Sequence, residues 1–244
     1  MNILTIGNSY GDDSQRYLHQ IAKADGVALN AVNLFIGGCS LARHHRNMLS
    51  ELPEYVLCCN GMSTGFKVSI KEALLNRDWD VVTLHQASHY STDYATYQPY
   101  LNNLAEYVRR LVPKAKLAIN QTWAYEQDSP RLNEMMGYKD QADMFRDLDA
   151  AYRKAADEVG ADVFIPSGEV FQALLASGIK KVHRDTYHAG LGVGRYALGL
   201  TWYVILTGKE VKDNAFADFD EEITPEQIET VKKCVTEVTR KYLG

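Results

Sequence analysis

The sequence has 244 residues, of which 46% are hydrophobic and 23% charged, with a formal net charge of −5. This length and composition fit one sizeable core, and we expect a single domain over residues 1–244. The acidic balance and the lack of any Lys/Arg-rich run in the sequence argue against a nucleic-acid partner or an anionic membrane surface, so we expect a small or neutral substrate.

Short apolar runs alternate with longer stretches of helical period along the chain. Strands are predicted at Ile3 to Ile6, Leu29 to Ile36, Asp80 to Leu84, Lys116 to Asn120 and Asp162 to Ile165. Helices are predicted at Gln15 to Asp25, Ile70 to Asn76, Tyr97 to Val112, Asp140 to Val159, Glu169 to Ser177, Gly192 to Thr207 and Pro225 to Leu243. This alternation is typical of βαβ units and predicts a parallel sheet of about five strands covered on both faces.

Two segments have local signals of their own. Asp12 precedes Gln15 by three residues, which predicts a capping box at the start of the first helix, and Gly26 lies where that helix would end. Residues 50 to 69 interrupt the alternation with Pro53 and Gly61, which predicts a small hairpin or a lid over one end of the sheet.

Cysteine usage and hydropathy bear on the compartment. The four cysteines include no CxxC pair, which favours free thiols in a reducing compartment. A strand is predicted directly after Met1 without signal-peptide features, so the sequence as it stands predicts a cytoplasmic protein, or a secreted or periplasmic one if a leader has been removed. The most hydrophobic stretch, Leu191 to Leu206, contains Arg195 and is too short to span a bilayer, so we expect a buried helix and no membrane partner.

Small, polar and aromatic residues follow four of the predicted strands. The ligand crevice of an open parallel sheet lies outside the carboxyl ends of its strands, so these residues are candidates for a site. They are Gly7-Asn8-Ser9, Gly37-Gly38-Cys39-Ser40, His85-Gln86-Ala87-Ser88-His89 and Gln121-Thr122-Trp123-Ala124-Tyr125.

A pair of residues near the C-terminal helices could activate Ser9 as a nucleophile. Asp185 and His188 have a spacing at which the carboxylate can accept the Nδ1 proton and leave Nε2 free as a base. A serine hydroxyl becomes a good nucleophile only when such an oriented base takes its proton. Ser9 alone would be an ordinary turn serine, and Asp185 alone a helix cap, but together the three residues predict a nucleophile, a base and its orienting group.

Acyl transfer also needs hydrogen-bond donors for the developing oxyanion. The backbone amide of Ser9, a glycine amide from Gly37 or Gly38, and the side chain of Gln86 are the candidates. Gly38 alone would equally be explained by a positive φ angle, and Gln86 by backbone bonding at a strand end.

These residues resemble the four blocks of the SGNH (GDSL-type) hydrolases. Gly7-Asn8-Ser9 resembles the Gly-Asp-Ser block with Asn8 in place of Asp, Gly38 (or Gly37) resembles the second-block glycine, and Asp185 with His188 matches the last block. The third block departs, because His85-Gln86-Ala87-Ser88 has no asparagine. The strings WDVVTLHQAS and NQTWAY, within a resemblance over residues 3 to 206, are similar to a bacterial SGNH-like subfamily of unknown function.

The resemblance implies a flavodoxin-like three-layer α/β/α fold and a serine esterase or deacetylase that uses no metal or other cofactor. It places Ser9, Asp185 and His188 in catalysis and Ser9, Gly38 and Gln86 in the oxyanion hole. The His85 to His89 spacing is that of zinc proteases, but it follows a strand and lacks their glutamate, so we expect no metal.

The sequence says least about the substrate. Trp123 and Tyr125 on their loop predict an aromatic platform for a sugar ring, with His85 beside it. We therefore expect removal of a small acyl group, acetyl above all, from a carbohydrate or similar polyol. The alternatives are a lipase- or thioesterase-like hydrolase of longer acyl chains and a non-catalytic carbohydrate-binding relative.

Overall fold

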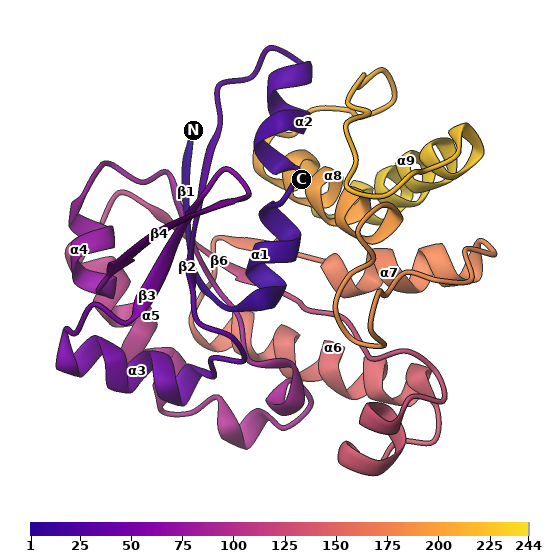
Figure 1. The fold of residues 1–244 in the computed structure, drawn as a ribbon. Coiled ribbons are helices and arrows are strands. Elements are labelled where there is room, and N and C mark those ends of the chain that lie inside the picture. Colours follow the sequence, from indigo (N-terminus) through magenta and orange to yellow (C-terminus); the bar gives the residue numbers. More distant parts are fainter. Residues whose placement is uncertain (244) are drawn as a thin grey trace.

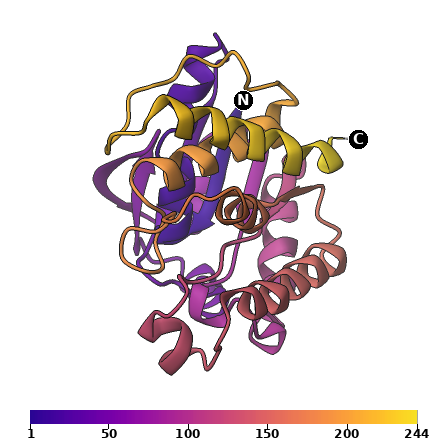
Figure 2. The ribbon, with the colours of Figure 1, turned by 90° about the vertical axis from the view of Figure 1, so that its right-hand side faces the viewer.

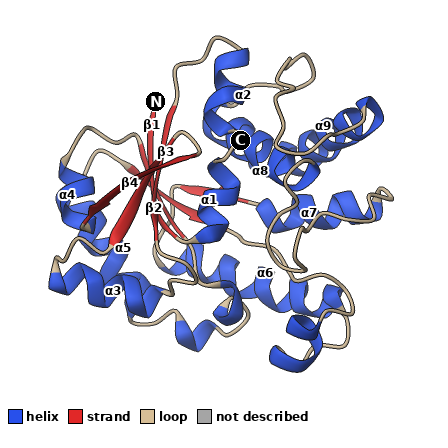
Figure 3. Ribbon diagram, viewed as in Figure 1, coloured by secondary structure: helices blue, strands red, loops and turns tan. Residues whose placement is uncertain are grey.

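The computed structural model describes residues 1–243 and contains a sheet in the strand order β4-β3-β2-β1-β5-β6-β7. The strands are β1 (Asn2–Gly7), β2 (Asn30–Phe35), β3 (Tyr55–Cys59), β4 (Met62–Val68), β5 (Val81–Leu84), β6 (Lys116–Asn120) and β7 (Val163–Ile165). β2, β1, β5, β6 and β7 pair in parallel, in the order of a flavodoxin-like sheet (Figure 3). The predicted fold and its five parallel strands are confirmed, and the whole sheet has two strands more.

The two additional strands form an antiparallel hairpin at one edge of the sheet. β3 pairs with β2, and β4 pairs with β3. Asn60 and Gly61 join the two strands with φ angles of 52° and 80°, as a two-residue turn matched to strand twist requires. The segment predicted as a hairpin or a lid is therefore a hairpin that extends the sheet.

Helices cover both faces of the sheet, because neighbouring residues of each strand point to opposite sides. Ile3 belongs to the core under one group of helices and Leu4 to the core under the other. The first group is α1 (Ser9–Gln15), α2 (Leu18–Ala24), α7 (Ser167–Ala176), α8 (Val193–Thr207) and α9 (Pro225–Thr239). The second is α3 (Leu41–Ser50), α4 (Ile70–Leu75), α5 (Tyr100–Leu111) and α6 (Gln141–Glu158) (Figure 1). Figure 2 shows α9 (yellow) lying over α8 (orange), which leaves α8 buried between α9 and the rest of the protein.

The start of the chain differs from prediction in one way that matters for the site. The helix predicted over residues 15 to 25 corresponds to α2 (Leu18–Ala24), and a separate short helix that was not predicted, α1, precedes it and begins at Ser9. The Asn8 side chain caps it by accepting a hydrogen bond from the Tyr10 amide at 2.9 Å. The expected capping box at Asp12 and Gln15 is wrong, because the cap lies four residues earlier.

Helix α8 is the buried helix expected from the apolar stretch after Leu191. Within residues 1–243, no helix combines the length and the apolar character that crossing a bilayer would need. The four cysteines are free thiols.

Candidate active site

The site lies at the carboxyl ends of β1, β2 and β5. The chain moves from β1 to β2 on one side and returns to β5 on the other, so the loops after these strands diverge and leave a crevice between them. A pocket of about 350 Å³ occupies this crevice. Its walls are Asn8, Ser9, Tyr10, Phe35, Gly37, Gly38, Ser88, His89, Arg131, Tyr187 and His188.

Ser9 stands at the first position of α1, directly after the β1 strand. Gly7 permits the turn that carries it there, because a Cβ at Gly7 would lie 2.6 Å from Asn33 Oδ1 and 2.8 Å from His85 Cε1. The amide of a first helical residue has no acceptor within its own helix. Ser9 therefore presents both a hydroxyl and an N–H group at the pocket.

Ser9, His188 and Asp185 form a continuous chain of hydrogen bonds. His188 Nε2 lies 2.8 Å from Ser9 Oγ, and His188 Nδ1 lies 2.8 Å from Asp185 Oδ2. Asp185 Oδ1 also accepts from the His188 amide at 2.9 Å, which fixes the carboxylate relative to the ring. The sequence-predicted nucleophile, base and orienting residue are thus brought together although 176 residues separate Ser9 from Asp185.

Electrostatics keep Asp185 ionised. Partial burial acts to raise its pKa, but the hydrogen bonds from His188 and the nearby imidazole outweigh burial and hold the pKa below its ordinary value. An ionised Asp185 accepts the Nδ1 proton of His188, and the Nε2 lone pair then faces the serine hydroxyl.

A buried carboxylate anchors the loop that carries this histidine. Asp13, in α1, accepts from the Ala189 amide at 3.1 Å and from the Arg184 guanidinium at 2.8 and 3.0 Å. Arg195 of α8 donates to the same carboxylate at 2.9 Å. The nucleophile helix and the histidine loop are therefore joined through Asp13.

Gly38 lies in the pocket wall, on the segment after β2. Its φ angle is +60°, a conformation that favours glycine, and a Cβ built there would meet no atom within 4 Å. The neighbouring Cys39 carbonyl accepts from Asn8 Nδ2 at 3.1 Å, which ties this segment to the residue before the nucleophile. Ser9, Gly37 and Gly38 all line the pocket, so the assignment of Gly38 rather than Gly37 as an oxyanion donor stays a prediction.

Gln86 is placed differently from the prediction. Its Oε1 accepts from the amides of Leu41 and Ala87, and its Nε2 donates to the backbone and hydroxyl oxygens of Thr96. The side chain is fully buried and lies outside the pocket wall. Both of its polar groups hold loops in place, so in this structure the Gln86 amide does not reach the oxyanion position assigned to it from the sequence.

The three predicted substrate-binding residues are also buried behind the pocket wall rather than in it. Trp123 stacks on Tyr10 with ring centroids 4.1 Å apart, Tyr125 donates to Ser88 Oγ at 2.9 Å, and His85 Nε2 lies 3.0 Å from Asn8 Oδ1. Each is at most 1% exposed. The prediction that they contact substrate is corrected: each supports a residue of the wall.

Several residues that line the pocket have no role in the sequence-based prediction, among them Tyr187, His89 and Arg131. Tyr187 lies inside the Asp185-x-x-His188 motif, so its proximity to His188 was readable from spacing alone. His89 follows β5 and belongs to the segment predicted as a site candidate, but the sequence assigned it no catalytic or substrate-binding role. Arg131 begins a short π-helical turn (Arg131–Met135) that precedes α6, and no local pattern pointed to it.

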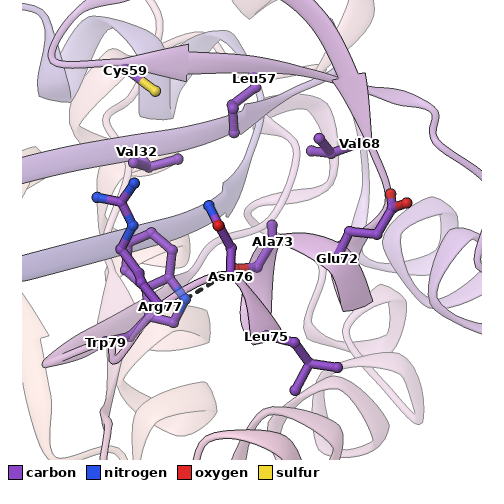
Figure 4. Close-up of a pocket in the computed structure, with 10 residues that line it drawn as sticks. All are labelled: Val32, Leu57, Cys59, Val68, Glu72, Ala73, Leu75, Asn76, Arg77 and Trp79. Atoms are coloured by element: carbon purple, nitrogen blue, oxygen red, sulfur yellow. Dashed lines mark hydrogen bonds between the residues drawn. The ribbon is translucent and has the colours of Figure 1, made fainter.

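Two other features bear on what the molecule can bind. No group of three His, Cys, Asp or Glu side chains arranged to hold a metal ion occurs in the part of the chain described, residues 1–243. A second cavity, of about 420 Å³, lies between the β3–β4 hairpin and α4, and the Arg77 guanidinium lies over the Trp79 ring at its rim (Figure 4). It shares no wall residue with the Ser9 pocket.

Comparison with known proteins places the chain in a family. The family model described as a domain of unknown function, DUF4886, matches residues 2–237, and the chain therefore belongs to the DUF4886 family. A DUF4886 family protein from Bacteroides uniformis has 31% sequence identity and a TM-score of 0.93, with 100% of this chain and 96% of that chain covered. No functionally curated protein matches the sequence.

More distant solved structures share the fold. A candidate SGNH hydrolase from Slackia heliotrinireducens has a TM-score of 0.62 at 21% identity, covering 84% of this chain and 98% of that chain. A candidate GDSL-like lipase from Parabacteroides merdae has a TM-score of 0.56 at 16% identity, covering 85% and 95%. The expected likeness to the SGNH fold is thus confirmed.

Proposed function

We propose that this DUF4886 protein is a serine hydrolase of carboxylic esters that removes small acyl groups, acetyl above all, from a carbohydrate or similar polyol. The observation that carries the proposal is the unbroken hydrogen-bond chain from Ser9 through His188 to Asp185 at the edge of a pocket. The shared fold with a candidate SGNH hydrolase and a candidate GDSL-like lipase supports the same reaction class.

The reaction follows from the roles of these atoms. His188 Nε2 takes the Ser9 proton as Oγ attacks the ester carbonyl carbon, and the Ser9 and Gly38 amides receive the resulting oxyanion. When the tetrahedral intermediate collapses, His188 returns the proton to the leaving alcohol. Water deprotonated by His188 then attacks the acyl-enzyme, which releases the carboxylic acid and restores Ser9.

Two features of the pocket favour a short acyl group over the longer chain of a lipase or thioesterase. The volume of about 350 Å³ must hold the acyl group and part of the alcohol. Phe35, Tyr10 and Tyr187 are the aromatic members of a wall that is otherwise glycine, serine, asparagine, histidine and arginine. The polar side chains of this wall can hydrogen-bond the hydroxyl groups of a polyol, while its aromatic rings contact the apolar faces of the substrate.

The decisive experiment is acetate release from 4-nitrophenyl acetate by the unmodified protein and by Ser9→Ala and His188→Ala. We expect each variant to lower kcat by roughly 10⁴-fold. Ser63→Ala, on the exposed edge strand β4, is the matched control and should retain full activity. Equal activity in Ser9→Ala and the unmodified protein would contradict the proposal, as would fluorophosphonate labelling at Ser14 or Ser88 instead of Ser9. A non-catalytic carbohydrate-binding relative would leave the ester intact in every sample.

A further inference from the structure

The pocket beside Ser9 carries a positive charge that the hydrolysis chemistry does not use. Within the described chain, its wall contains Arg131 and no Lys, Asp or Glu. The protein as a whole has a formal charge of −5, which predicted a small or neutral substrate. The wall therefore holds a cation although the protein as a whole is acidic, and the nearby carboxylate of Asp185 is hydrogen-bonded to His188 and lies outside the wall.

Arg131 has no counter-ion in the structure. Among residues 1–243, the arginines that form ion pairs within 4.0 Å are Arg16, Arg146, Arg153, Arg184 and Arg195. Arg131 lies instead over the Tyr187 ring, with its guanidinium carbon 3.8 Å from the ring centroid. A cation held on an aromatic face keeps its N–H groups free for an anion.

The surface that holds this cation is itself fixed. The Tyr187 carbonyl accepts from Tyr10 Oη and from Trp123 Nε1, both at 2.8 Å. The Tyr187 ring also contacts the His188 imidazole, with centroids 3.9 Å apart. Arg131 is therefore placed by the same loop that places the base.

The direction of proton transfer assigns this cation to one part of the substrate. His188 must reach the leaving oxygen to protonate it, so the alcohol part of an ester extends toward His188 and Tyr187. The oxyanion side of the pocket, formed by Ser9 and Gly38, belongs to the carbonyl. Arg131 thus faces the alcohol part.

We propose that Arg131 recognises a carboxylate or similar oxyanion on the alcohol part of the ester, which narrows the substrate to an acylated polyol that also carries an acidic group. This inference rests on the proposed function and narrows its substrate class. A guanidinium can bind a carboxylate or a sulfate through two parallel N–H bonds, and a pocket without acidic side chains offers no internal competitor.

The test compares 4-acetoxybenzoate with its methyl ester, using acetate release as the readout for both. The two probes differ in the negative charge of the alcohol part. We define the ratio as kcat/KM for 4-acetoxybenzoate divided by kcat/KM for its methyl ester. We expect Arg131→Gln to lower this ratio by about tenfold, chiefly by raising KM for the anionic ester. Arg131→Lys should retain part of the ratio. Arg110→Gln is the matched control, because Arg110 lies over the Tyr107 ring on α5, away from the pocket, and it should leave the ratio unchanged.

Three results would overturn the inference. The first is an equal ratio in Arg131→Gln and the unmodified protein. The second is a ratio in the unmodified protein that about 0.5 M NaCl does not lower, because salt screens a half-exposed ion pair. The third is that Arg131→Gln changes the preference for mono-4-nitrophenyl succinate over 4-nitrophenyl butyrate but not the preference for 4-acetoxybenzoate over its methyl ester. That result would place the bound anion on the acyl part of the substrate.

Failure of this inference is distinguishable from failure of the proposed function. Ser9-dependent hydrolysis of the neutral ester with an unchanged ratio refutes the role of Arg131 alone. Calorimetric binding to Ser9→Ala supplies a readout without turnover: 4-acetoxybenzoate should bind about tenfold more tightly than its methyl ester, and adding Arg131→Gln should abolish the difference. Anion-dependent binding without hydrolysis would support the subsite and refute the enzyme.

Discussion

Asn8 Nδ2 donates a hydrogen bond to the Cys39 carbonyl oxygen 3.1 Å away, so one side chain joins the nucleophile turn to the glycine segment on the other side of the pocket. Asn8 Oδ1 accepts from the Tyr10 amide at 2.9 Å and lies 3.0 Å from His85 Nε2. Every polar atom of this buried side chain is used. The spacing between the Ser9 and Gly38 amides therefore depends on Asn8.

We expect Asn8→Ala to lower both stability and activity. Removing the side chain leaves a helix uncapped and buried polar partners unsatisfied, which costs about 2 kcal/mol of unfolding free energy. The loss of one correctly placed oxyanion donor lowers kcat by about 100-fold. Urea denaturation and ester hydrolysis measure the two effects. Asn30→Ala, an exposed asparagine in β2 that bonds Asn2 Oδ1, is the control and should change stability by less than about 0.5 kcal/mol.

The parallel strands were predictable because each is a short apolar run whose residues are buried on both faces. β1 and β5 show this best, since nearly all their residues are buried. Helix α3 was missed because its middle, Arg43 to Asn47, is polar, and His44 is buried there by tertiary contacts with Tyr55. Helix α1 was missed because Asp12 and Gln15 mimic a capping box, which predicts that the first helix begins only after Asp12.

The catalytic residues of the site were predictable because their chemistry fixes their spacing in the sequence. The exposure of the other site residues was not predictable, because it depends on tertiary packing. Asp185 and His188 lie three residues apart, so sequence spacing alone paired them. Trp123 was expected at the surface, but Tyr10 and Phe171 pack against its ring and bury it. Arg131 reaches the pocket because the chain places the short π-helical turn Arg131–Met135 beside Tyr187, and no local sequence pattern encodes that placement.

Buried histidines predict that stability falls at acidic pH. Burial lowers the pKa of His44 to about 3 and that of His85 to about 4, whereas both titrate near 6.5 when unfolded. Between these values the unfolded chain binds more protons, so stability declines as the pH falls from about 6.5 toward 4. At pH 5 each histidine should cost about 2 kcal/mol relative to pH 7.

His44→Gln isolates one of these contributions. Urea denaturation at pH 8 measures the packing effect of the substitution, because the imidazole is neutral there in both states. Between pH 8 and pH 5 the variant should lose about 2 kcal/mol less stability than the unmodified protein. Parallel stability curves over this pH range would contradict the prediction.

Asp13→Asn should weaken the link between the nucleophile helix and the histidine loop. The Asp13 side chain is 1% exposed and accepts from Arg184, Arg195 and the Ala189 amide. Within the described part of the chain, removing its charge leaves Arg184 without a carboxylate partner and Arg195 with Asp220 alone, which costs about 3 kcal/mol of unfolding free energy. Asp143→Asn breaks an exposed pair with Arg146 and should cost less than about 1 kcal/mol. Equal losses in the two variants by urea denaturation would refute a structural role for the buried network.

Asp185→Asn separates a catalytic role of Asp185 from a structural one. An asparagine keeps an oxygen that accepts from the His188 amide, so the turn is preserved, and because the Asp185 side chain is 44% exposed, stability should change by less than about 1 kcal/mol. Its NH₂ group, however, would face His188 Nδ1 and favour the tautomer protonated on Nε2, which cannot accept the Ser9 proton. We therefore expect kcat on 4-nitrophenyl acetate to fall by about 10⁴-fold with an unchanged urea midpoint. If Asp185 served only the turn, the variant would keep its activity, and a joint loss of activity and stability would mean that the loop had unfolded.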